Sequence, residues 1–127
     1  MKGELSCMKL NPNCIRDILI TVEQHSDFYH QTHYKKELPF STLSRYSHEE
    51  ILYHINQCKL SNLINDVHYY DAGNHIDIRD LTPEGHEFLA NIRNNTVWKE
   101  IFSKVGEASL PIIIESAKQL ALKHFLG

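Results

Sequence analysis

Apolar residues recur at helical spacing near the start of the chain. They follow an i, i+3, i+4, i+7 pattern, at Ile15, Ile18, Leu19 and Val22. Asn11 precedes them as a capping residue, and Pro12 suits the first position of a helix. The pattern therefore predicts a helix from Pro12 to about Gln24 with one buried face.

A second helix is predicted to follow Ser47. Ser47 and Glu50 have the spacing of a capping box, in which each side chain satisfies a backbone N–H of the other residue. An apolar stripe follows at Ile51, Leu52, Ile55 and Cys58, and we expect it to join the stripe of the first helix in one core. The opposite face carries polar and aromatic residues: Glu49, Tyr53, His54, Asn56 and Gln57.

A polar hairpin is predicted next. Residues 67–70 are rich in strand formers, and in residues 75–79 the apolar Ile76 and Ile78 alternate with polar side chains. The link between them, residues 71–74, contains Asp, Ala, Gly and Asn, and such a sequence suits the positive φ angles of a hairpin turn.

Three helices are predicted after the hairpin, over 83–94, over about 97–105 and over 110–126. Their capping residues are Thr82, Thr96 and Ser109. The first of them buries a stripe at Gly85, Phe88, Leu89 and Ile92, which we expect to reach the common core.

The stretch between the first two helices has no clear periodicity. Residues 37–40 could form a short edge strand, since a proline such as Pro39 is tolerated only at an edge. Residues 41–46 could form one helical turn, in the place that the second helix of a winged helix occupies. Together the elements predict a mainly α (α+β) fold: a winged helix-turn-helix with a small antiparallel β-hairpin wing and additional C-terminal helices.

The domain organisation expected is a lead-in at 1–8, a winged-helix domain at 9–95 and a helical extension at 96–127. Translation could start at Met1 or at Met8. The last helix is apolar on more than one face, so we expect a homodimer, although the helix could also fold back onto its own domain. The interface residues predicted are Ile112, Ile113, Leu120, Leu122, Phe125 and Leu126.

Charge bears on the choice of partner. The chain of 127 residues has a net charge of −3, and residues 9–95 hold 8 basic and 12 acidic residues, a net charge of −4. DNA-binding domains gain affinity by neutralising phosphates with Lys and Arg, and residues 9–95 have no excess of these residues over Asp and Glu. No signal peptide or membrane span is recognisable, which predicts a soluble, cytoplasmic protein with no membrane partner.

Catalytic and metal chemistry find little support in the residue pattern. His25, His30 and His33 with Asp27 could suggest a metal site, but no Cys-x-x-Cys pair accompanies them, and solvated loop histidines are the simpler interpretation. The three cysteines, Cys7, Cys14 and Cys58, have no framework spacing and suit reduced thiols. We therefore expect no enzyme, no metal and no cofactor.

Binding of double-stranded DNA is the function that the predicted fold favours. The exposed face of the second helix would enter the major groove, and basic residues around it would contact the phosphate backbone. The residues proposed for these contacts are His48, Tyr53, His54, Gln57, Lys35, Lys36, Arg45, Lys59 and Arg79. The alternative is a winged-helix module that binds a protein partner and has no DNA affinity, which the charge favours.

Three segments carry a resemblance to a known family: Met8–Leu19, Ser47–Ile55 and Leu81–Arg93. Over roughly residues 8–100 the chain resembles an uncharacterised family of prophage-associated bacterial proteins, a domain of unknown function. The resemblance implies a phage or prophage origin and carries no catalytic residue. More loosely, the sequence Leu-Thr-Pro-Glu-Gly after a hairpin is similar to winged-helix transcriptional regulators, which implies a regulator of prophage type.

Overall fold

The structure is a computed structural model that describes the backbone of residues 8–126 and the side chains of residues 8–124. Its helices and strands are α1 (Pro12–His25), β1 (Thr32–Lys35), α2 (His48–Leu60), β2 (Ile64–Tyr70), β3 (His75–Leu81), α3 (Pro83–Ile92), α4 (Asn95–Val105) and α5 (Leu110–Leu126). Two short 3-10 turns, η1 (Ser41–Leu43) and η2 (Asp71–Gly73), complete the order. This is a mixed α+β fold.

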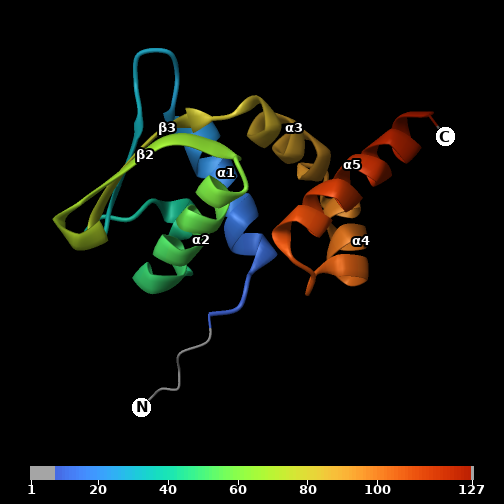
Figure 1. Ribbon diagram of the computed structural model, residues 1–127, viewed down its shortest axis with the longest axis horizontal. Helices are drawn as coiled ribbons and strands as arrows, with labels where there is room; N and C mark the ends of the chain where they lie inside the picture. The colour runs from blue at the N-terminus through green and yellow to red at the C-terminus, as the bar shows by residue number, and fades with distance from the viewer. Residues whose placement is uncertain (1–7, 127) are drawn as a thin grey trace.

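The three strands form one antiparallel sheet in the order β1-β3-β2. Ile78 of β3 lies between Thr32 of β1 and Val67 of β2, and Ile76 pairs with Tyr34 and Tyr69. Ile76, Ile78, Thr32 and Tyr34 are buried, so one face of the sheet packs on the helices. The β2–β3 hairpin projects on one side of the molecule, and α4 and α5 lie on the other (Figure 1).

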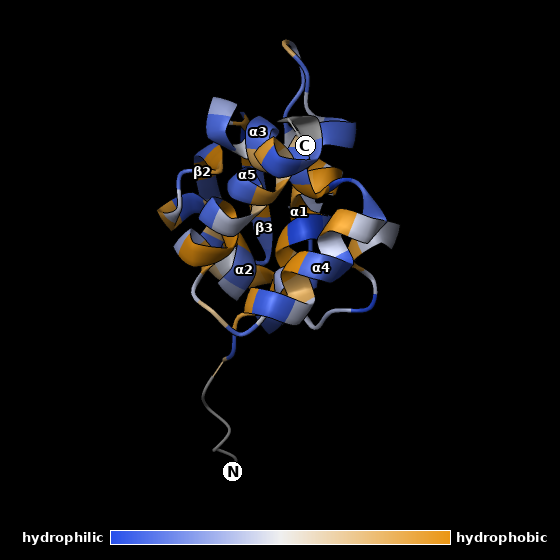
Figure 2. Cartoon of the chain, turned by 90° about the vertical axis from the view of Figure 1, so that its right-hand side faces the viewer, coloured by the Kyte–Doolittle hydropathy of each residue, from blue (hydrophilic) through white to orange (hydrophobic). Residues whose placement is uncertain are grey.

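Helix α1 lies at the centre of the core. Its predicted stripe is buried throughout, and it packs on α2, α3, η1 and β3. The core then continues into the last two helices through Trp98, Ile101, Ile113 and Ala117. Figure 2 shows hydrophobic and hydrophilic segments along α4 and α5, the mixed pattern of helices with one buried face.

Most of the predicted elements are confirmed. Asn11 caps α1, and both hydrogen bonds of the predicted capping box between Ser47 and Glu50 are present at the start of α2. The hairpin turn has positive φ at Asp71, Ala72 and Gly73, as predicted. The helical turn expected within residues 41–46 is η1.

Two predicted element positions are wrong. The short edge strand is not at residues 37–40 but at Thr32–Lys35, because Thr32 and Tyr34 alternate into the core against β3. Helix α4 begins at Asn95 and not after Thr96, because the Asn94 side chain accepts hydrogen bonds from the backbone N–H groups of Thr96 and Val97.

Leu52 departs from the predicted core. Ile51 and Ile55 are fully buried, whereas Leu52 is only partly buried and packs at the margin of the core beside Gly73 of the hairpin turn. The reason is the helix period: the buried face of α2 is centred on Ile51, Ile55 and Cys58, which places Leu52 on the flank toward the hairpin.

A cluster of backbone contacts joins the end of α2 to the start of α3. The Thr82 N–H donates to the Leu63 carbonyl (3.0 Å), and the Thr82 hydroxyl donates to the Asn62 carbonyl (2.6 Å). Gly85 packs directly on Leu63, and a Cβ at Gly85 would overlap the Leu63 carbonyl oxygen. This contact explains why glycine follows Leu81-Thr-Pro-Glu although it weakens a helix.

Strand β2 is a sheet edge with one irregular residue. Asp66 has φ 49°, and the pair Asp66–Arg79 is missing from the otherwise continuous register of β2 with β3, while Asn65 and Val67 on either side pair normally. A left-handed residue that is not glycine is uncommon in a strand and bends it locally. The free edge of β2 is therefore not a straight row of hydrogen-bonding groups.

We predict that Gly85→Ala destabilises the protein, although alanine favours helices by about 1 kcal/mol over glycine. The added methyl group has no room beside the Leu63 carbonyl, and overpacking of this kind costs roughly 1–3 kcal/mol. Urea unfolding measures the change. The control is Ala90→Gly at an exposed position of the same helix, which should lose only about 1 kcal/mol. A stabilised Gly85→Ala would contradict the packing described here.

Candidate functional site

The outer face of α2 and the hairpin beside it form the candidate site. A groove of about 390 Å³ runs between them, lined by Leu52, Asn56, Tyr69, Ala72 and Gly73. Exposed residues continue this surface along α2: Glu49, Asn56, Lys59 and Leu60, with Tyr53 partly exposed. We call the groove and these residues the α2–hairpin surface.

His54 is not part of this surface. It was predicted to contact DNA, but its side chain is 0% exposed because it lies on the side of α2 that faces α1. Its Nδ1–H donates to the Glu50 carbonyl (2.7 Å), and its Nε2 accepts the backbone N–H of Asn11 (2.8 Å). Both ring nitrogens are satisfied in the neutral form, and burial lowers the pKa of His54 below its ordinary value.

His48 is partly buried and has a partner within the chain. Its Nδ1 bonds to the Tyr34 hydroxyl (2.8 Å), and the two rings stack with centroids 5.7 Å apart. Burial of the Tyr34 phenol raises its pKa, so Tyr34 stays a neutral partner. This bond turns the His48 ring toward β1, and the contact of His48 with DNA stays a prediction that the geometry disfavours.

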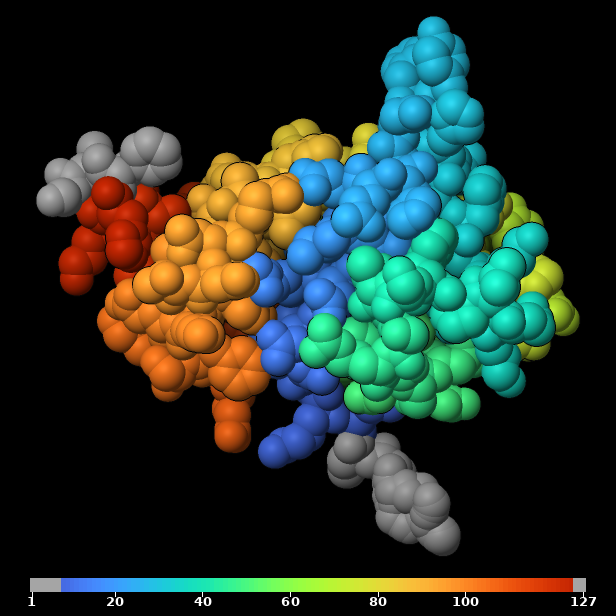
Figure 3. Space-filling view, turned by 180° about the vertical axis from the view of Figure 1, so that it is seen from behind, coloured from blue at the N-terminus to red at the C-terminus, as the bar shows by residue number. Residues whose placement is uncertain are grey.

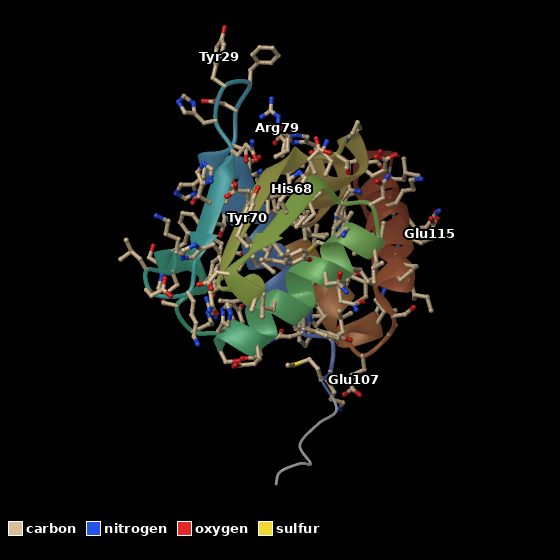
Figure 4. The ribbon with its side chains drawn as sticks, turned by 60° about the vertical axis from the view of Figure 1, so that its left-hand side comes forward. Tyr29, His68, Tyr70, Arg79, Glu107 and Glu115 are labelled. Carbon is tan, nitrogen blue, oxygen red and sulfur yellow. The ribbon has the colours of Figure 1, made fainter. Side chains whose placement is uncertain are left out.

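Two of the predicted phosphate-binding arginines have partners within the chain. Arg79 donates to the backbone carbonyls of Asp27 (3.1 Å) and Phe28 (2.8 Å), and it holds the loop between α1 and β1. Figure 4 shows Arg79 below the tip of this loop, where Tyr29 points away from the body of the molecule. Arg45 lies 3.8 Å from the Asp17 carboxylate and over the Tyr46 ring.

The remaining predicted contacts lie at the surface but are not all together. Lys59 lies over the Tyr69 ring at 5.7 Å, and Gln57 is partly exposed on the side of α2 away from the hairpin. Lys35 and Lys36 are exposed at the end of β1, beside the outer face of the sheet. The structure thus places Lys59 beside Tyr69 of the groove, whereas Lys35 and Lys36 lie at the other side of the hairpin turn, where Lys35 pairs with His75 and the Lys36 N–H donates to the Asn74 carbonyl.

The histidine-rich loop shows pairs and not a cluster. His30 bonds to the Asp27 carboxylate, whose pKa the bond from the His30 side chain lowers, and His33 bonds to Asp77 (2.6 Å) on β3. Among residues 8–126, no three His, Cys, Asp or Glu side chains converge as metal ligands.

The two cysteines within the described part of the chain are buried free thiols. Burial raises the pKa of Cys14 to about 12 and also raises that of Cys58, which disfavours the reactive thiolate at neutral pH. Cys7 lies outside the described residues.

The predicted dimer residues separate into covered and exposed ones. Ile113 is buried in its own chain and Leu120 is partly buried, whereas Ile112 is 53% exposed and Leu122 is 49% exposed. The prediction for Ile113 as an interface residue is wrong, because this side chain packs into the monomer core. The side chains of Phe125 and Leu126 lie outside the described residues.

Leu60 and Tyr69 are site residues that sequence reasoning missed. Leu60 is 71% exposed at the end of α2, and Tyr69 closes the groove from β2. A signal was available for Leu60, since it stands outside the i, i+3, i+4 spacing of Ile51, Ile55 and Cys58. Tyr69 gave no such signal, because its place in the groove depends on how the hairpin packs beside α2.

The chain matches, over residues 9–111, the family described as hypothetical protein (DUF2513). It belongs to the DUF2513 family. An uncharacterized protein of Haemophilus influenzae is 30% identical to this DUF2513 chain over 115 residues, which cover 90% of the chain and 92% of that protein. No solved structure matches it. The predicted resemblance to a domain of unknown function is thus confirmed, and the prophage origin stays a prediction.

No helix in the described part of this DUF2513 chain is long and apolar enough to cross a membrane.

We predict that His54 makes stability fall with acid. The folded state holds His54 neutral, so its pKa lies below the unfolded value near 6.5. The stabilisation is complete above pH about 6.5 and is lost as the pH falls below it, because the unfolded chain binds the proton first. In urea unfolding, His54→Gln should lose less stability than the wild type between neutral and mildly acidic pH.

The matched control is His86→Gln on α3, at an exposed position, which should retain the wild-type pH dependence. If His54→Gln and wild type lost stability in parallel on acidification, the neutral buried histidine would be the wrong explanation.

Proposed function

We propose that this chain is a winged-helix module that binds a protein partner through the α2–hairpin surface, without using α2 as a DNA-reading helix. The observation that carries the proposal is that four of the residues predicted to contact DNA are buried or have partners within the chain. His54 is buried, His48 bonds to Tyr34, Arg79 holds two loop carbonyls and Arg45 lies beside Asp17.

The order of elements supports the winged-helix scaffold. A helix, a short strand, a helical turn, a helix and a β-hairpin follow each other from α1 to β3, and β3 lies between β1 and β2. In this assignment η1 takes the place of the second helix, α2 is the helix that would enter a groove of DNA, and the hairpin is the wing.

The chemistry of the surface supports a protein partner. Leu52, Leu60 and Tyr69 supply apolar area around a groove wide enough for one large side chain. Acidic residues lie at its ends, Glu49 at the start of α2 and Asp71 in the turn, against the single Lys59. We infer that the partner presents an apolar side chain flanked by Lys or Arg.

Duplex DNA is the second candidate, favoured by the exposure of Tyr53 and Lys59 on the helix that would read it. A salt-dependent titration separates the two functions. If the module binds protein, random duplex should bind weakly or not at all, and Lys59→Ala should change nothing. Tight binding that falls steeply with salt and weakens in Lys59→Ala, Lys35→Ala and Lys36→Ala would establish the DNA function instead.

The positive test uses a photo-crosslinking amino acid at Leu60, whose exposed position leaves the fold unaffected. In cells of an organism that encodes the chain, we expect a discrete adduct that protease removes and nuclease does not. The control position is Ala90, exposed on α3. Tyr69→Ala in the crosslinking chain should abolish the adduct, because the groove loses one wall. An adduct that nuclease removes, or the same adduct from both positions, would contradict the proposal.

We further propose that a second copy of the chain covers the outer face of α5, where Ile112 and Leu122 are exposed. Each of these side chains is about half exposed, so burying the remainder gains roughly 0.7–1.5 kcal/mol per side chain, which favours a two-fold contact. Among the predicted interface residues whose side chains the structure describes, Ile112, Leu122 and the exposed part of Leu120 remain.

Sedimentation velocity tests the dimer. We expect the wild type to dimerise at tens of micromolar and the double variant Ile112→Ser, Leu122→Ser to be monomeric with unchanged unfolding. Lys118→Ser, exposed on the same helix, is the control and should remain dimeric. A wild type that stays monomeric at this concentration would refute the dimer.

A further inference from the structure

A second hollow lies away from the α2–hairpin surface, between α1 and α4. Its volume is about 490 Å³, within the range of small-ligand sites. Its lining includes Asn13, Arg16, Asn95, Trp98, Lys99 and Phe102. Figure 3 shows α4 and the start of α1 side by side on one face of the molecule.

The two asparagines and Arg16 of this hollow have donors left over. The Asn13 Oδ1 accepts the Trp98 indole N–H (2.8 Å), and the Asn95 Oδ1 accepts from an Arg16 Nη2 (2.9 Å). Both amide oxygens are therefore used, and within the described residues neither NH₂ group makes a hydrogen bond. The Arg16 Nε–H is shielded from water and also has no partner there.

The charge of the hollow has one sign. Arg16 and Lys99 line it, and no carboxylate does, in a chain whose net charge is −3. Other hollows of the described chain differ, since one pairs Lys104 and Lys123 with Glu115, and the groove beside α2 carries no charged lining residue. Unbalanced donors and cations favour an anion.

An aromatic wall stands next to these donors. Phe102 is 40% exposed, and its ring meets Trp98 edge to face with centroids 6.0 Å apart. Trp98 itself is buried beneath Arg16, whose guanidinium lies 5.6 Å from the indole centroid. A planar ring can thus lie against Phe102 while an anionic group reaches Arg16 and Lys99.

We propose that this hollow binds a nucleoside monophosphate, with the phosphate held by Arg16, Lys99 and the two asparagine amides and the base against Phe102. The same chemistry is present in a free nucleotide and in the terminal nucleotide of a single strand. The site is independent of the α2–hairpin surface, so either can be right without the other.

Trp98 is the one tryptophan of the chain and reports on this site directly. Each of the four ribonucleoside monophosphates is titrated while Trp98 is excited at the red edge of its absorption, and equilibrium dialysis measures binding independently. We expect saturable binding of at least one nucleotide, with its nucleoside and inorganic phosphate each weaker by at least about tenfold, or ~1.4 kcal/mol. A titration with a 5′-phosphorylated oligonucleotide distinguishes the two ligands. Tighter binding of the oligonucleotide than of the free nucleotide indicates that the site takes the end of a strand.

Variants at exposed positions change binding without disturbing the folded core. Lys99→Glu should lower the affinity for the nucleotide by at least about tenfold. Phe102→Ala should remove the preference for nucleotide over inorganic phosphate. Lys118→Glu on α5 is the matched control and should bind as the wild type does. Absence of saturable binding in both measurements, unchanged affinity in Lys99→Glu, or inorganic phosphate as tight as the nucleotide overturns the proposal.

Discussion

Burial of α1 is the constraint on which the other elements depend. One face of this helix packs on α2, β3 and α3, and its fully buried residues lie at the centre of the core. Its flank holds α4 as well, because Asn13 accepts the Trp98 indole N–H and Arg16 donates to the Asn95 Oδ1. A single helix thus fixes the sheet on one side and the C-terminal helices on the other.

Helix α2 divides its residues between the core and the surface, and this division bears on function. The side toward α1 takes Ile51, His54 and Ile55, so a histidine that could have met a ligand instead accepts the backbone N–H of Asn11. What remains outside is short of positive charge and rich in apolar area. This composition supports the proposed protein partner over duplex DNA.

Local signals were enough for most of the fold and for little of the site. Capping residues and apolar periodicity placed α1, α2 and α3, since Asn11, Ser47 and Thr82 act on their own neighbours. Strand β1 was missed because its pairing partner lies over 40 residues away, at Ile76 and Ile78. Likewise, the partners of Arg79 are carbonyl groups some 50 residues earlier, which no spacing rule connects to it.

The irregular residue in β2 has a consequence for how copies of this protein can associate. An open sheet edge is a template on which identical strands can add without limit, the route to fibrils. Asp66 interrupts that template with a left-handed turn of the backbone and a negative charge repeated in every copy. The β2 edge is thereby a poor template for an added strand, which disfavours fibrous growth along this side of the sheet.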